Sequence, residues 1–218
     1  MGQFSDGDII YIYYEEEFYL YKILKVDEAA SIFHVLAYEV QDYLPYGEEI
    51  TDMAVKVFHA PVDIKAFDNA EILTKSKVTE YELQGYYEYV KQTQNPEVIA
   101  DMVNQLYMDA YSLAKDGDFG DAIEKYTSAI TLFPGFFQAI DNRAFCKMDL
   151  GLWNEAIEDF EMSLAVKPGT FLAEFSIGEC YLNAGDYKKA KGQFEKALAI
   201  EPSSEIAMEF LKKAAAKE

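Results

Sequence analysis

The side chains best suited to metal binding or proton transfer are few in this chain, with two histidines and two cysteines among 218 residues. His34 and His59 lie in strand-like segments, and together they would supply half of a metal site or an acid–base pair. No HxxxH-type spacing and no GxSxG, P-loop, GxGxxG, HExxH or CxxC motif is present. We therefore predict structural or surface histidines and no catalytic residue, metal or cofactor. An enzyme site around His34 and His59 is a minor alternative.

Cys146 and Cys180 lie in segments of helical sequence and have no metal-ligand companions. We therefore predict buried free thiols in a reducing compartment. The first residues have neither a basic start nor an apolar run, which indicates no signal peptide. No window approaches the roughly 18 apolar residues that a membrane helix needs. These features together predict a cytoplasmic protein with no membrane span.

Acidic residues outnumber basic ones in both halves of the chain, and the formal net charge is −20. Residues 1–100 hold 19 acids and 7 bases, and residues 101–218 hold 20 acids and 12 bases. Such a polyanion is repelled by nucleic acid and by anionic membranes, because binding to either depends on Lys and Arg. The charge therefore serves solubility or, alternatively, steers a basic partner toward the protein.

Residues 1–94 are expected to form a β-rich domain, because short runs of β-branched and aromatic residues are separated by polar links. Alternation within the second run places Val26 on the same face as Leu20 and Leu24. Pro61 is expected to end the fourth strand. The predicted strands, which would form a small antiparallel sheet or an SH3-like barrel, are 8–14, 18–26, 31–40, 53–60 and 70–73.

The sequence then changes to helical spacing. Thr79 and Glu82 have the positions of a capping box, and apolar residues follow at helical intervals. A helix is therefore predicted at about 79–92. Asn95 and Pro96 suit a helix cap and a first helical turn, so we expect a second domain at 95–218.

A pattern of 34 residues occurs three times without a gap in this second domain. Each copy has a glycine, an aromatic residue two positions later, then small and aromatic residues at helical spacing, and a proline near its end. The pattern predicts two helices per copy, because the glycine ends the first helix and the proline stops the second. The anchors are Gly117, Phe119, Ala122, Tyr126 and Pro134, then Gly151, Trp153, Ala156, Phe160 and Pro168, then Gly185, Tyr187, Ala190, Phe194 and Pro202.

A period of this length and composition resembles the tetratricopeptide repeat. The resemblance covers about residues 97–217 and implies an all-α solenoid with a capping helix at 205–217. With the β-rich domain in front of it, the predicted fold class of the whole chain is α+β. The three repeats would be 103–136, 137–170 and 171–204.

In the tetratricopeptide family, the first helices of the repeats line a concave groove, so the resemblance implies such a groove here. The subgroup that binds chaperone C-termini uses a carboxylate clamp of two lysines, two asparagines and an arginine. Only Asn142 matches that clamp. An aromatic groove with Asp141 and Glu179 would instead suit an apolar or basic peptide or helix. The residues carried over to the groove are Asn104, Tyr107, Met108, Tyr111, Gln138, Asp141, Asn142, Phe145, Met148, Leu172, Phe175, Ser176, Glu179 and Asn183.

We therefore predict a protein–protein interaction adaptor that binds a peptide or helix of another protein in this groove. One alternative comes from Gly7 and Asp8, which open the strands in a way loosely similar to small barrel-type bacterial immunity proteins. It implies an acidic inhibitor of a basic toxin or nuclease. In the other alternative the groove is filled by the N-terminal domain of the same chain or by a second copy of the chain. In the second case the protein would self-associate.

Overall fold

The chain divides between Gln94 and Asn95 into two units, Met1–Gln94 and Asn95–Glu218. The computed structural model describes residues 3–217. At the boundary the Asn95 side chain accepts a hydrogen bond from the Val98 N–H at 3.0 Å, and Pro96 occupies the first helical turn. The predicted cap is therefore formed, because Asn satisfies a free N–H and Pro has none to lose.

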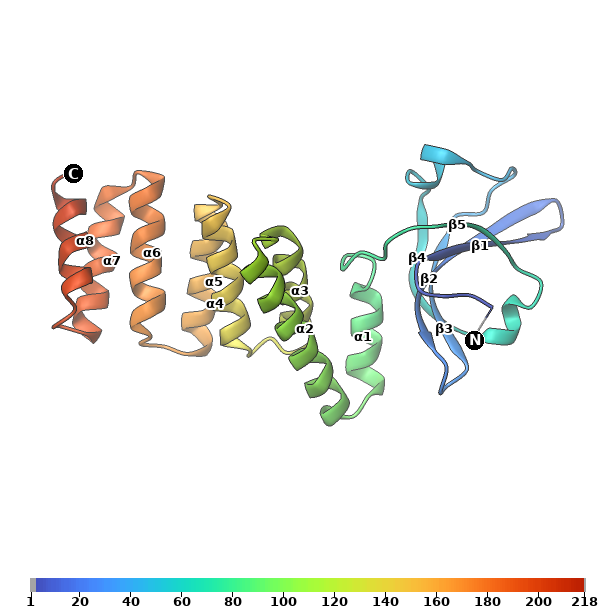
Figure 1. Ribbon diagram of the computed structural model, residues 1–218, viewed down its shortest axis with the longest axis horizontal. Coiled ribbons are helices and arrows are strands. Elements are labelled where there is room, and N and C mark those ends of the chain that lie inside the picture. Colours follow the sequence, from blue (N-terminus) through green and yellow to red (C-terminus); the bar gives the residue numbers. More distant parts are fainter. Residues whose placement is uncertain (1–2, 218) are drawn as a thin grey trace. The chain divides into compact units, whose positions relative to one another are not determined.

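The N-terminal unit contains a five-stranded antiparallel sheet with the strand order β4-β3-β2-β1-β5 (Figure 1). The first four strands form a meander, and the last strand returns to pair with the first. This confirms the predicted sheet. The strands are β1 (Asp8–Tyr14), β2 (Glu17–Asp27), β3 (Ile32–Tyr38), β4 (Val55–Asp63) and β5 (Glu71–Lys75), with short 3-10 helices η1 (Gly47–Ile50) and η2 (Ile64–Phe67) before and after β4.

Both faces of the sheet are buried, each by its own apolar cluster. One cluster contains Ile10, Ile23 and Phe33, and the other contains Leu20 and Leu24. Val26 packs on the first cluster, so its predicted place beside Leu20 and Leu24 is wrong. The cause is a register shift between Ile23 and Lys25, where one extra residue in β2 moves the following side chains to the opposite face.

The prediction that Pro61 ends the fourth strand is also wrong. β4 continues to Asp63, and Pro61 pairs with His34 of β3. Since β4 is an edge strand, it has one side without a strand neighbour, and a missing N–H on that side removes no ladder hydrogen bond.

Helix α1 (Gln84–Thr93) packs on β4. The predicted capping box is formed: the Glu82 carboxylate accepts from the Thr79 N–H at 2.8 Å, and the Glu82 N–H donates to the Thr79 hydroxyl at 3.3 Å. Regular helix nevertheless begins only at Gln84, after a turn. A Cβ on Gly85 would lie 2.7 Å from the Cβ of His59, so only glycine allows this approach.

The two histidines meet beneath α1. His34 Nδ1 and His59 Nε2 lie 3.0 Å apart, and their rings stack on each other and contact Tyr86 and Tyr89. Burial lowers the pKa of His34. Burial and then the charge of His34 lower the pKa of His59 to about 4. Both imidazoles are therefore held neutral as part of the packing between α1 and the sheet.

We expect the N-terminal unit to lose stability on acidification below about pH 6.5, the ordinary histidine pKa. The unfolded chain takes up protons there while the folded unit does not, so the free energy of unfolding falls until pH reaches the folded pKa values. Hydrogen exchange of β3 and β4 amides in the full chain would measure a fall in the free energy of unfolding of about 2–3 kcal/mol between about pH 7 and pH 4.5. In the double variant His34→Gln, His59→Gln the free energy of unfolding should depend less on pH. An unchanged pH dependence would show that the two histidines do not cause the loss of stability.

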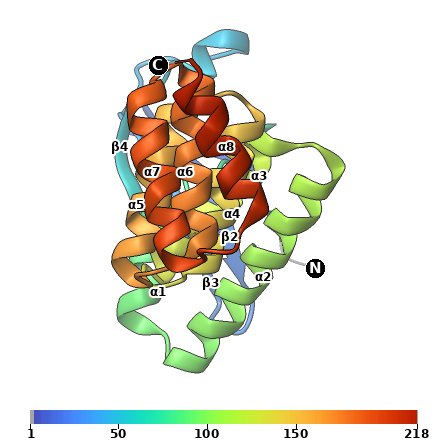
Figure 2. The ribbon, with the colours of Figure 1, turned by 90° about the vertical axis from the view of Figure 1, so that its left-hand side faces the viewer.

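The C-terminal unit consists of helix pairs stacked side by side (Figure 1). Helices of successive repeats begin 34 residues apart, and α8 covers α6 and α7 at the end of the array (Figure 2). The predicted helices and their turns are confirmed, but the first helix starts seven residues before Val103, the expected start of the first repeat. The helices are α2 (Pro96–Asp116), α3 (Phe119–Leu132), α4 (Phe137–Asp149), α5 (Trp153–Val166), α6 (Phe171–Ala184), α7 (Tyr187–Ile200) and α8 (Glu205–Ala215).

Small residues let the paired helices approach each other closely. Ala110 and Ala144 are fully buried, and the matching position in the third repeat is Gly178. A Cβ on Gly178 would lie 2.5 Å from the Phe194 ring, so the aromatic residue of α7 occupies the place of a side chain on α6. Cys146 and Cys180 are buried, unpaired thiols, as predicted, and burial raises their pKa to about 11 and about 12.

One buried ionic network joins three helices of the first two repeats. Arg143 of α4 donates to both carboxylate oxygens of Asp159 on α5, at 2.8 and 2.6 Å, and to the Thr127 hydroxyl on α3 at 3.0 Å. Lys147 pairs with the same Asp159 carboxylate at 2.7 Å. Within residues 3–217, no helix is both long and apolar enough to cross a membrane.

We expect Asp159→Asn to lower the free energy of unfolding of the C-terminal unit by about 3 kcal/mol, because two cations would lose their buried counter-charge. Urea titration followed by the fluorescence of Trp153, the only tryptophan, measures this. The exposed pair of Lys189 with Asp186 provides a control, since Lys189→Gln should cost less than about 0.5 kcal/mol. If both changes lowered the free energy of unfolding equally, the buried network would contribute no more to stability than an exposed ion pair.

Candidate functional site

The structure places the predicted groove residues at three levels of exposure. Six are exposed, five are half-buried and three are buried, so the set does not form one continuous surface. The exposed residues are Asn104, Met108, Tyr111, Gln138, Leu172 and Asn183. The half-buried ones are Tyr107, Asn142, Phe145, Met148 and Glu179, and the buried ones are Asp141, Phe175 and Ser176.

The buried members cannot serve as surface anchors. Phe175 lies in the core of the third repeat, where its ring contacts Phe194 and Phe210. Ser176 is 1% exposed. Burial raises the pKa of Asp141, which a hydrogen bond with Ser163 partly offsets. Helix packing, which the position within the repeat does not reveal, removes these residues from the candidate surface.

A second group of predicted residues does come together on α2 and α4. The Asn142 amide donates to the Tyr107 hydroxyl at 3.0 Å. The Tyr107 ring also lies 4.9 Å from the ring of Phe136 in the turn before α4. These contacts fix Tyr107 as a ridge between α2 and α4, with a cavity on each side of it.

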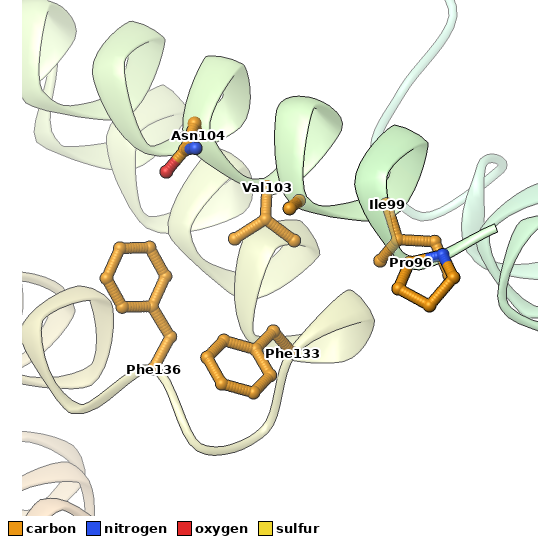
Figure 3. Close-up of a pocket in the computed structure, with 7 residues that line it drawn as sticks. Pro96, Ile99, Val103, Asn104, Phe133 and Phe136 are labelled. Atoms are coloured by element: carbon orange, nitrogen blue, oxygen red, sulfur yellow. The ribbon is translucent and has the colours of Figure 1, made fainter.

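The first cavity has a volume of about 390 Å³ and lies between the start of α2 and the turn that joins α3 to α4 (Figure 3). Figure 3 shows Val103 and Asn104 of α2 on one side and the rings of Phe133 and Phe136 on the other. Asn104 is its one polar lining residue and the only one that the sequence had indicated. The lining residues are Pro96, Ile99, Ala100, Val103, Asn104, Phe133 and Phe136.

Phe133 and Phe136 were missed because the repeat pattern draws attention to the positions that the three copies share. Phe133 caps the C-terminus of α3, and the equivalent residues after α5 and α7 are Lys167 and Glu201. Phe136 precedes α4, where the later repeats have Thr170 and Ser204. Aromatic residues in the first repeat at positions that are polar in the other two were the available signal. The Phe133 side chain is 54% exposed.

The second cavity has a volume of about 250 Å³ and lies where α2 ends and α3 begins. Tyr111, Asn142 and Phe145, which were predicted, line it together with residues that were not. Lys115 and Asp149 give it a mixed polar character that the first cavity lacks. The other lining residues are Ala114, Phe119 and Cys146.

Both cavities follow one face of α2. Its lining residues recur at helical spacing from Pro96 to Asn104 and again from Tyr111 to Lys115, and the interval of about two turns between the two sets keeps them on one helical stripe. From Ala100 to Ala114 the helix rises about 21 Å. Met108 and Tyr111, which are 58% and 54% exposed, lie on this half of the helix. The site is thus a strip with an apolar cavity at the start of α2, a cavity of mixed polarity at its end and the Tyr107 ridge between them.

The comparisons with known proteins fit this architecture. Residues 172–204 match the family model described as "Tetratricopeptide repeat". Comparison with curated protein sequences gave no match. The C-terminal unit therefore contains at least one repeat that is recognisable from sequence alone.

Solved structures extend the likeness beyond that repeat. The Arabidopsis OM64 TPR domain has a TM-score of 0.52 at 21% identity, and the match covers 55% of this chain and 99% of that domain. The second TPR domain of human RPAP3, in complex with the HSP70 peptide SGPTIEEVD, has a TM-score of 0.50 at 24% identity and covers 56% and 98%. The TPR2B domain of yeast Sti1, in a complex with pHsp70, has a TM-score of 0.51 at 18% identity and covers 54% and 98%.

These matches cover little more than half of the chain, and at such identities they establish the fold alone. The C-terminal unit has the tetratricopeptide-repeat fold, as its sequence period predicted, and the N-terminal sheet is joined to it.

We expect Phe133→Lys to change the free energy of unfolding by less than about 0.5 kcal/mol, because Phe133 is exposed. The change introduces the residue that the second repeat has at this position, Lys167. The fully buried Phe160→Ala provides the contrast and should cost about 3–5 kcal/mol. Urea titrations followed by Trp153 fluorescence compare the two. A loss of stability in Phe133→Lys close to that of Phe160→Ala would make Phe133 a structural residue.

Proposed function

We propose that the protein is an adaptor whose C-terminal unit binds a segment of another protein along α2. The observation that carries the proposal is the aromatic wall of Phe133 and Phe136 at positions that are polar in the other repeats. Large apolar side chains left exposed around a hollow are typical of binding surfaces, since they gain free energy only when a partner covers them.

The two hollows favour a partner segment with two apolar anchor side chains. The apolar cavity at the start of α2 suits a branched or aromatic side chain, and the mixed cavity beyond Tyr107 suits one with a polar tip. An extended peptide would span the roughly 21 Å between them with about six residues, at about 3.3 Å per residue.

The charge of α2 favours a basic segment. No Lys or Arg occurs between Lys91 and Lys115, whereas Glu97, Asp101 and Asp109 lie on the helix. A partner with Lys or Arg beside its apolar anchors would be attracted to this strip, and the remaining negative charge of the protein would speed the encounter.

The same features argue against the ligands of the structural neighbours. The peptide in the human RPAP3 complex, SGPTIEEVD, contains three acidic residues. Here Asn142, the one match to the carboxylate clamp, already donates its amide to Tyr107. We therefore propose a different partner, one that is basic and carries apolar anchors. The two reduced, buried cysteines are consistent with a cytoplasmic setting, and the proposed role is binding and not catalysis.

Capture of partners from a lysate of the native host, with mass spectrometry as the readout, tests the proposal. The tagged full chain would be compared with Phe133→Lys and Tyr111→Lys at about 0.1 M and about 0.5 M salt. Ile206→Lys on α8 is the matched control, because Ile206 is 50% exposed and Phe133 is 54% exposed. We expect at least one partner to be lost with both α2-strip variants and kept by the control.

A basic partner that all three variants keep at low salt and lose at high salt would contradict the α2 strip as the site. It would favour the acidic inhibitor instead. Sedimentation equilibrium tests the remaining alternative, in which the chain self-associates. If the chain forms a dimer and Phe133→Lys dissociates it, a second copy of the chain occupies the α2 strip.

A further inference from the structure

The N-terminal unit contains a cavity of its own, with a volume of about 610 Å³. It lies over the sheet face that carries Leu36 and Tyr38, between the segment from Gly47 to Val55 and the segment from Thr74 to Glu82. A volume of this size accommodates a small organic molecule. All of its lining residues belong to the N-terminal unit, so it is independent of the α2 strip.

A buried charge lies in this cavity. Lys22 of β2 is 3% exposed, and its ammonium group donates to both carboxylate oxygens of Glu82 at 2.8 Å and to the Lys77 carbonyl oxygen at 2.9 Å. Along β2 this lysine stands between Leu20 and Leu24, in the apolar stripe of the same face. A buried ion pair contributes less to stability than an apolar pair of the same size, so folding alone does not explain it.

Tyr38 offers a free hydrogen-bond donor beside this ion pair. Its side chain is 9% exposed and lines the cavity. Among residues 3–217 the buried side-chain polar atoms without a partner are Asp141 Oδ1 and Ser176 Oγ, so the Tyr38 hydroxyl is not sealed in the interior and faces the open space of the cavity. Burial and then the charge of Glu82 raise the pKa of Tyr38 to about 12, so the hydroxyl keeps its proton and can donate it.

The charge of the lining also differs from that of the rest of the unit. Residues 1–94 hold 18 acidic and 7 basic residues. The cavity lining holds Lys22, Lys75 and Lys77 against the single acid Glu82. Lys75 also pairs with Asp8 at 3.3 Å. Lys22 and Lys75 are each paired with a carboxylate, so the preference of the cavity for an anion rests on the excess of basic over acidic groups in its lining, which the rest of this acidic unit lacks.

Aromatic rings form the mouth of the cavity. Phe58 and Tyr81 are 43% and 71% exposed, and their rings meet edge to face with centroids 5.8 Å apart. Apolar side chains, among them Ile9, Leu36 and Met53, form the walls. Such a lining binds the apolar body of a ligand and leaves a few polar groups to orient it.

We propose that this cavity binds a small organic carboxylate with an aromatic or branched apolar body. The Tyr38 hydroxyl donates to the carboxylate, the lysines supply positive potential, and the body lies between the sheet and the rings of Phe58 and Tyr81. The N-terminal unit would thereby have a small-molecule site of its own, in addition to the proposed protein-binding site of the C-terminal unit.

NMR titration of the full chain with three compounds that share a three-carbon phenylpropyl skeleton tests this. The probes are 3-phenylpropionate, 3-phenylpropanamide and 3-phenylpropylamine, which differ only in the polar end group. We expect saturable shifts at Ile9, Ile50 and Met53 with the carboxylate, weaker binding of the amide and the weakest binding of the amine. Tyr38→Phe should weaken carboxylate binding at least about tenfold, the effect of one hydrogen bond to a charged group. Tyr21→Phe is the matched control, since Tyr21 packs on the opposite face of the sheet.

Lys75→Gln removes one positive charge from the cavity lining and should reduce the preference for the carboxylate over the amine. If this variant does not fold, Phe58→Ala at the exposed mouth should weaken all three probes by a similar factor. The proposal is overturned if the folded wild-type chain shows no saturable shift in the cavity, if the amine binds as tightly as the carboxylate, or if Tyr38→Phe binds like wild type. None of these results bears on the α2 strip.

Discussion

The close approach of paired helices is the constraint on which the repeat array depends. Each pair has one aromatic residue that fills the space opposite a small residue, as Phe194 does against Gly178. Because one helix pair cannot bury its apolar faces alone, the packing recurs through the array and ends only where α8 covers the last pair. The same regularity aligns α2, α4 and α6, and it also draws Asp141, Phe175 and Ser176 into the interior.

Departures from the repeat, more than the repeat itself, define the candidate surface. A strict copy of the later repeats would place a lysine or glutamate where Phe133 stands and a hydroxyl residue where Phe136 stands. The two rings, the extra turns of α2 and the Tyr107 ridge make the first repeat different in shape and polarity. The shared positions serve the packing of the array, whereas the exposed aromatic positions are the ones that the proposed binding role uses.

The N-terminal unit buries polar side chains within its apolar packing. Two neutral histidines lie on β3 and β4, and an ion pair lies in the cavity. His34 and His59 meet, as an enzyme site would have required, but Tyr86 and Tyr89 of α1 pack on both rings. The cavity of this unit is lined instead by Lys22, Tyr38 and Glu82. No short sequence motif contains Lys22, Tyr38 and Glu82, so motif searches do not find the polar groups of this cavity.

The sequence by itself determined what depends on local periodicity. The 34-residue period set the helices and turns of the array, alternation set the five strands, and Asn95 with Pro96 set a helix start, since caps and turns act within a few residues. Tertiary structure decided what depends on contacts between distant residues. It brought His34 to His59 and Lys22 to Glu82, shifted Val26 across the sheet and buried Phe175. It also opened the two cavities along α2, because burial and cavities arise only from side chains that separate elements bring together.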